Sequence, residues 1–244
     1  MSEIGLQAAE AAAANRSRAL SSNELPIRAL AASSTSNINL TGDILTKETG
    51  ILINLNNGIV DINENISLSS TNTASIIINS DITSTNSSSL NFSVSDSDLQ
   101  IQSIAGLNDL SISNGSSLTQ IKGDLTMTGE LTGNSTPSIT LVGDRSISSN
   151  SIDFSSTEIV ADSAESSVIT LEATTTINLA ETTVEQLSVT SSELILNGDI
   201  TTSLDTASSM NLSGAGKITL GADSTLTGNL TLKNDTGIVP IDSA

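Results

Sequence analysis

The chain contains no cysteine, histidine, tyrosine or tryptophan, and its only aromatic residues are Phe92 and Phe154. Without cysteine no disulfide can form, and the sequence does not indicate a redox compartment. Most side chains that act as general bases, nucleophiles or transition-metal ligands are also missing. This composition predicts a protein that is not an enzyme.

Basic residues are scarce, with 8 Lys and Arg against 27 Asp and Glu and a formal net charge of −19. Proteins that bind nucleic acids contact phosphates through clustered Lys and Arg, so this balance argues against a nucleic-acid partner. It also disfavours anionic membrane surfaces. Divalent cations or a basic partner are compatible with so acidic a surface.

Long apolar runs are absent as well. No stretch approaches the ~20 apolar residues that a membrane-spanning helix needs, so we expect no membrane insertion. The N-terminus shows no basic region followed by an apolar core, and no Sec signal peptide is recognised.

The sequence does contain a repeated alternation of aliphatic and small polar residues, as in the pairs at 210/212, 218/220 and 230/232. In an extended chain residues i and i+2 point to the same face, so each pair predicts a short strand with one buried side. This rule predicts strands at 38–40, 51–55, 59–62, 66–68, 76–78, 90–94, 99–101, 110–112, 125–127, 139–141, 152–154, 168–171, 177–179, 187–189, 194–196, 210–212, 218–220 and 230–232.

Aspartates beside small residues recur at separations of 38, 43, 20, 18, 37 and 24, at Asp43, Asp81, Asp124, Asp144, Asp162, Asp199 and Asp223. A unit of about 20 residues predicts a solenoid in which each turn buries its face against the next. We therefore expect an all-β, elongated parallel β-solenoid (β-helix) or β-fibre over residues 37–244, with about ten turns and a length on the order of 50 Å.

An antiparallel sandwich is the competing fold. Asn-Gly pairs at 57–58, 114–115 and 197–198 are typical of type I′ hairpin turns and favour it locally. Two aromatic residues are too few to fill the space between two packed sheets, which favours the solenoid.

The N-terminus is different in character. Residues 3–20 are rich in alanine, with acids before bases, which predicts an α-helix. A second short helix is expected over 24–32, capped by Asn23. We divide the chain into a helical attachment or oligomerisation segment (1–32), a linker (33–36) and the β-domain (37–244).

Three patterns suggest chemistry. Asp96 and Asp98 would share one face of a strand and form a calcium candidate, although two solvated carboxylates are the simpler interpretation. The GAGK at 214–217 lacks the first glycine and the final Ser/Thr of a phosphate-binding loop. Threonines at 126, 128 and 174–176 suggest the flat arrays of ice-binding solenoids, but exposed strand threonine is the simpler interpretation.

The phrases TGDILT (41–46), KGDLTMTGELTGN (122–134), VITLEATTTINL (168–179) and GKITLGADSTLTGNLTLKNDTG (216–237) resemble the β-rich shafts of bacteriophage tail fibres and appendages. They are also similar to β-helical passengers of secreted bacterial adhesins. The resemblance implies an elongated, often trimeric or polymeric structural protein that displays or attaches.

The leading functional hypothesis is a structural subunit of a virion fibre or appendage, assembling with copies of itself through its N-terminal segment and its solenoid ends. The alternative is a subunit of a secreted bacterial filament, surface layer or adhesin, for which calcium dependence is expected. Either hypothesis implies a location outside the cell or on the virion surface and a virion or cell-surface partner. A polysaccharide-cleaving β-helix ranks third, because aromatic sugar platforms are missing.

Overall fold

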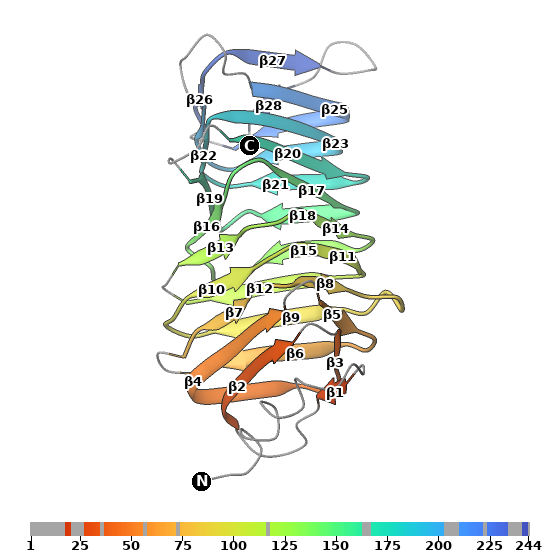
Figure 1. The fold of residues 1–244 in the computed structure, drawn as a ribbon. Coiled ribbons are helices and arrows are strands. Elements are labelled where there is room, and N and C mark those ends of the chain that lie inside the picture. The colour runs from red at the N-terminus through yellow and green to blue at the C-terminus, as the bar shows by residue number, and fades with distance from the viewer. Residues whose placement is uncertain are drawn as a thin grey trace.

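The chain winds into a β-solenoid with three strands in each full turn (Figure 1). The structure is a computed structural model. It describes residues 18–20, 27–34, 37–55, 58–71, 74–115, 118–162, 167–202, 210–221, 224–233 and 241–243. Every strand pairing in these ranges is parallel, which confirms the parallel β-solenoid and contradicts the antiparallel sandwich.

The strands stack into three faces, which the chain visits in the order 1, 2, 3. Face 1 contains β1 (Arg18–Leu20), β3 (Ile38–Leu40), β5 (Ile59–Ile62), β8 (Asp81–Thr83), β11 (Ile104–Leu107), β14 (Leu125–Met127), β17 (Arg145–Ser149), β20 (Val168–Ala173), the first parts of β23 (Gln186–Leu196) and β25 (Met210–Leu220), and β27 (Leu230–Lys233).

Face 2 contains the first part of β4 (Ile44–Leu55), β6 (Ile66–Ser70), β9 (Leu90–Val94), β12 (Leu110–Asn114), β15 (Glu130–Gly133), β18 (Ser151–Phe154), β21 (Thr176–Leu179), the later parts of β23 and β25, and β28 (Ile241–Ser243).

Face 3 contains β2 (Ile27–Ser34), the later part of β4, β7 (Ile76–Ile78), β10 (Leu99–Ile101), β13 (Thr119–Ile121), β16 (Ser138–Leu141), β19 (Glu158–Ala161), β22 (Thr182–Val184), β24 (Ile200–Thr202) and β26 (Leu226–Thr227).

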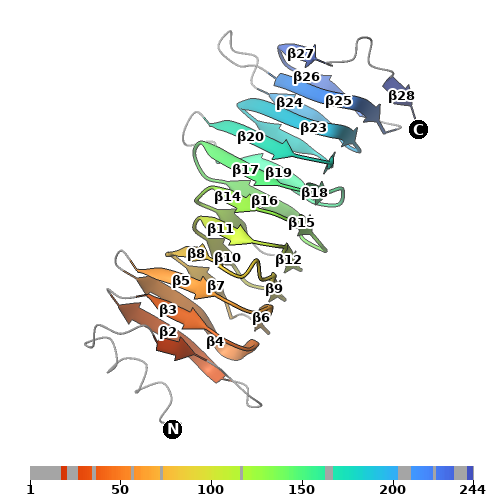
Figure 2. The ribbon, with the colours of Figure 1, turned by 90° about the vertical axis from the view of Figure 1, so that its right-hand side faces the viewer.

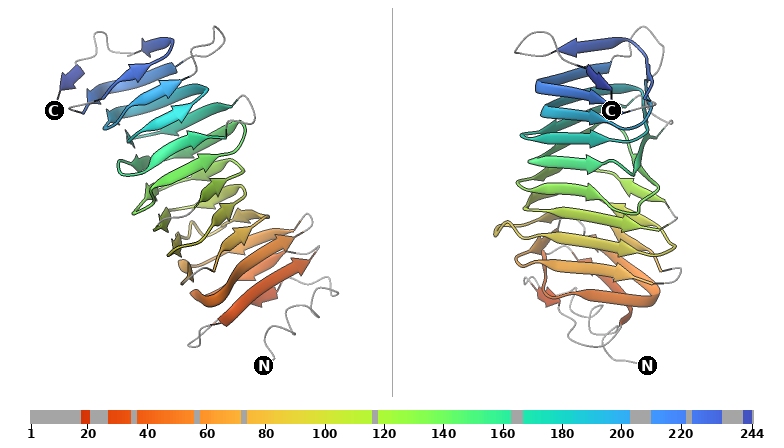
Figure 3. Two further views of the ribbon diagram at one scale, coloured as in Figure 1. Left: turned by 90° about the vertical axis from the view of Figure 1, so that its left-hand side faces the viewer. Right: turned by 180° about the vertical axis from the view of Figure 1, so that it is seen from behind.

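Strands of successive turns pair in register, so inward side chains form columns along the axis. The central column of face 1 runs through Ile38, Val60, Ile82, Ile104, Leu125, Ile147, Leu171, Val189 and Leu212, eight steps of 18 to 24 residues. At a strand spacing of ~4.8 Å these eight steps span about 38 Å. Figures 2 and 3 show this stack from the side, with the N-terminal and C-terminal turns at opposite ends.

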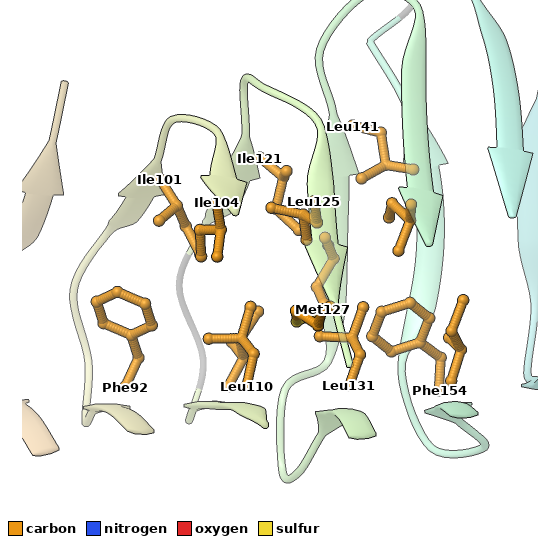
Figure 4. Close-up of a cluster of buried hydrophobic side chains, with 14 of the residues drawn as sticks. Phe92, Ile101, Ile104, Leu110, Ile121, Leu125, Met127, Leu131, Leu141 and Phe154 are labelled. Carbon is orange, nitrogen blue, oxygen red and sulfur yellow. The ribbon is translucent and has the colours of Figure 1, made fainter. Parts of the chain in front are cut away.

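The core is a narrow column of aliphatic side chains, as the two-residue alternation predicts. Figure 4 shows several successive turns of it, where Phe92 and Phe154, three turns apart, enter from face 2 and lie among isoleucines and leucines. Both rings are 0% exposed. Gly133 is the residue next to Phe154 in the same column, and a β-carbon there would lie 3.0 Å from the ring carbon Cδ1. Phe92, in contrast, pairs in register with Leu68 and Ile112, so the cross-section also admits a ring between larger aliphatic residues.

The N-terminal region differs from the helical expectation wherever the structure describes it. β1 and β2 are strands that pair in parallel with β3 and β4. Most of the helix expected over 3–20 lies outside the described residues. The helix expected over 24–32 is a strand from Ile27 onward, and this strand continues to Ser34, inside the expected linker. Helix propensity is a weak preference, and the edge of the stack supplies backbone partners that override it.

The corners of the solenoid are tight, and Gly123 illustrates the constraint. A β-carbon at Gly123 would lie 2.3 Å from the backbone nitrogen of Ser103 in the preceding turn, whereas at Gly221 the nearest atom would be 3.1 Å away. We predict that Gly123→Ala lowers the free energy of unfolding by about 2 kcal/mol or more, because the backbone must shift. Gly221→Ala should cost clearly less. Denaturant unfolding followed by circular dichroism measures both, and equal losses would contradict this account of the corner.

Candidate functional site

The two carboxylates proposed as a calcium candidate do not lie on a strand. Asp96 and Asp98 are exposed residues of the bend between β9 and β10, on either side of the buried Ser97. The Ser97 hydroxyl donates to the carbonyl oxygen of Ala74 in the preceding turn, at 2.6 Å. The chain bends here because the inward-facing hydroxyl closes the corner, so both carboxylates point to solvent. Their role as calcium ligands stays a prediction.

Four of the seven recurring Asp residues, Asp43, Asp124, Asp144 and Asp199, have a structural role that the sequence pattern did not reveal. Asp144 directly precedes β17, and its carboxylate accepts a hydrogen bond of 2.8 Å from the backbone N–H of Val168, the equivalent position one turn later. The same arrangement, with distances between 2.7 and 3.0 Å, occurs at Asn37, Asp43, Asn65, Asp109, Asp124 and Asp199. We call these seven side chains the corner acceptors.

Five of the seven corner acceptors are aspartates, among the 27 acidic residues of the chain, and two are asparagines. Each directly precedes a strand, where its side-chain oxygen satisfies a backbone N–H that the strand ladder leaves out. Each turn has three corners, one before each face, and the corner acceptors occur at all three. They do not form a single column along the axis, which explains why the Asp spacing in the sequence is irregular. Half-buried Arg145 adds a weak ion pair, with its Nη1 3.9 Å from Oδ1 of Asp124. These carboxylates hold turns together.

The other two sequence patterns do not come together as sites. The GAGK segment forms part of β25, where the pairing with β23 shifts register, rather than a turn. Thr126 is an exposed residue of β14, whereas the hydroxyls of Thr174 and Thr175 donate to Asn150 at a corner. The threonines therefore do not form one flat array.

No group of three or more acidic side chains within metal-binding reach occurs among the described residues. Likewise, the part of the chain that the structure describes contains no helix long and apolar enough to cross a membrane.

The most distinctive surface is the C-terminal end of the stack, where inward columns become exposed. Leu230 and Leu232 of β27 continue the columns of Met210 and Leu212, which are 0% and 1% exposed. The two leucines are 42% and 39% exposed. We call the surface formed by Leu230 and Leu232 the uncovered end. Covering the exposed part of each leucine with another apolar surface would contribute about 1 kcal/mol to the free energy of that contact.

The strands beside these leucines are also edges. In the described residues β26, β27 and β28 each pair on one side only, with β24 or β25, and at the other end β1 and β2 pair only with β3 and β4. Unpaired strand edges are templates for pairing with another chain. The exposed leucines and the strand edges at the ends of the stack therefore offer a surface for contact with another chain.

The corner acceptors give a testable expectation for stability. Replacing Asp144 by Ala removes the acceptor for the Val168 N–H, and we predict a loss of about 1 kcal/mol in the free energy of unfolding. Asp98→Ala removes an equally exposed carboxylate that makes no side-chain hydrogen bond within the described residues, so it should change stability by less than about 0.5 kcal/mol. If both variants unfold at the same denaturant concentration, the corner acceptors have no special role.

Calcium binding at Asp96 and Asp98 would be weak, because two exposed carboxylates provide few of the six to eight oxygen ligands that calcium takes. We predict a dissociation constant of about 1 mM or weaker by isothermal titration calorimetry, and no binding after Asp96→Asn with Asp98→Asn. Micromolar binding would contradict the predicted weakness, and binding that survives the double substitution would place the site elsewhere.

No family model, no curated protein and no solved structure matches this chain. Its function is therefore inferred from its own geometry and sequence pattern.

Proposed function

We propose that the chain is a non-enzymatic structural subunit of an elongated fibre or filament. The observation that carries this proposal is the parallel ladder of face 1, whose central column runs through eight steps and whose pairing shifts register at one bulge, between Ala105 and Leu107. A stack of this kind transmits its rigidity along one axis and presents long flat sides, which suits a spacer or shaft.

The first setting is a virion fibre or appendage, for which the similarity of the repeats to bacteriophage shafts is the support. The second is a secreted bacterial filament, surface layer or adhesin. The uncovered end with its leucines favours the second setting, because it suits repeated end-to-end contact. In either setting the protein would act outside the cell or on the virion surface.

Self-association is the partnership that the molecule supports best. Residues 1–32 would attach one subunit to its neighbour, and the two edges of the stack would complete the contact. Such contacts remove the unpaired edges that a single-chain solenoid otherwise exposes to the solvent.

Negative-stain electron microscopy of the full chain, with and without calcium, tests the function. We expect rods whose described core is on the order of 40 Å long, single or joined along the axis. Deleting residues 1–32 should abolish assembly and leave a β-type circular dichroism spectrum. Round particles, or assemblies that persist unchanged after the deletion, would contradict the proposal. Long filaments would favour the secreted bacterial filament, surface layer or adhesin, whereas rods of uniform length would favour the virion fibre or appendage.

A further inference from the structure

We infer that the uncovered end of one molecule binds the β1–β2 edge of a second copy, head to tail. This inference rests on the proposed function, since it names the surfaces through which the elongated assembly grows. The contact would bring β26 and β27 of one copy against the first turn of the next copy.

The first argument is continuity of the core. In the central column of face 1 each inward residue is covered by the turn that follows it, and Val189 and Leu212 are 0% and 1% exposed. The next member of the column, Leu232, has no following strand of face 1 among the described residues and is 39% exposed. Leu230 beside it stands in the same position relative to Met210. One more turn would bury both leucines, and the strands β1 and β2 of a second copy run in the same direction as the strands they would meet.

The second argument is backbone pairing. The outer sides of β26, β27 and β28 at one end, and of β1 and β2 at the other, make no strand pairing within the described residues. Because every strand pairing in the described residues is parallel, an N-terminal edge placed on a C-terminal edge continues the same ladder. Two like ends could meet only as antiparallel strands related by a two-fold axis, which would break the ladder.

The third argument is charge. Half of the 8 basic residues of the chain lie in its first 47 residues, which carry no net charge: Arg16, Arg18, Arg28 and Lys47 against Glu3, Glu10, Glu24 and Asp43. Residues 199–244 contain five acids and two bases. A contact between unlike ends brings an acidic region to a neutral one, whereas two C-terminal ends would repel each other. Charge therefore favours the head-to-tail contact over a closed dimer.

Such a contact is heterologous, because different surfaces of the two copies meet. Repeating it adds subunits along one axis without closing, unless the rotation between copies returns to the start. The assembly would be a polar filament whose growth depends on both edges.

The test compares two charge insertions on the same strand. Leu230→Asp with Leu232→Asp places carboxylates on the uncovered end, whereas Thr231→Asp places one on the exposed outer side of β27. We expect the leucine variant to weaken association on the order of a hundredfold in analytical ultracentrifugation, because buried charges lack partners. The Thr231 variant should associate like the natural chain. Thermal unfolding followed by circular dichroism shows whether both variants are folded, and equal association of the two variants would overturn the inference.

Mixing variants tests the direction of the contact. Arg18→Glu with Arg28→Glu changes the first 47 residues from no net charge to a net charge of −4 and leaves Leu230 and Leu232 unchanged. Alone, this variant and the leucine variant should each remain monomeric. Mixed, they should form a complex of two subunits and no larger species, because one supplies the intact N-terminal edge and the other the intact C-terminal edge. A dimer of the arginine variant alone would show that like ends meet, and would overturn the head-to-tail contact.

The same measurements separate this inference from the proposed function. If the natural chain gives only single rods, the head-to-tail contact is wrong, while the structural role in a virion fibre still stands. If the chain gives round particles, both are wrong.

Discussion

The whole structure depends on in-register stacking of one turn on the next. A single turn has three short strands and cannot bury its own inward side chains; Ile82 and Ile147, both 0% exposed, are covered by the turns above and below them. Stability is therefore a nearest-neighbour property. A side chain too large for its level, or a β-carbon at a crowded corner such as Gly123, strains the contact between two particular turns.

Corners are the second requirement, because there the backbone leaves the ladder and its polar groups lose their regular partners. The molecule satisfies them in two ways. Outside, the corner acceptors bind backbone N–H groups of the following turn, as Asp144 does with Val168. Inside, buried hydroxyls donate to carbonyl oxygens of the preceding turn: Thr157 to Gly133 at 2.8 Å, and Thr136 to Ile112 at 3.1 Å. Both devices use small polar residues, which explains why a chain with a mostly aliphatic core is so rich in Ser, Thr, Asn and Asp.

The sequence predicted the strands in which two inward aliphatic residues stand two positions apart, but it missed β11, whose inward Ile104 and Leu107 are three apart. For strands such as β5 and β9, the expected bounds lie within one residue of the observed ones. The expected repeat of about 20 residues agrees with the steps of 18 to 24 residues along the central column of face 1. Strands with a single inward aliphatic residue were missed. In β8 only Ile82 faces the core, and in β24 Thr202 takes the second inward position, so neither forms a recognisable pair. Two expected strands at 187–189 and 194–196 are one bent strand, β23, because the corner between them keeps extended geometry.

The candidate surfaces were harder to predict because they depend on what lies next to a residue in space. Leu230 and Leu232 have the same spacing as Met210 and Leu212, and only the stack shows that one pair is covered and the other is not. Asp96 and Asp124 are equally acidic in the sequence, yet Asp124 stands directly before a strand and accepts the Ser146 N–H, while Asp96 lies in a bend. The alternation of residues determines which side of a strand faces inward. Position along the stack determines whether that inward side is covered by a further turn or exposed.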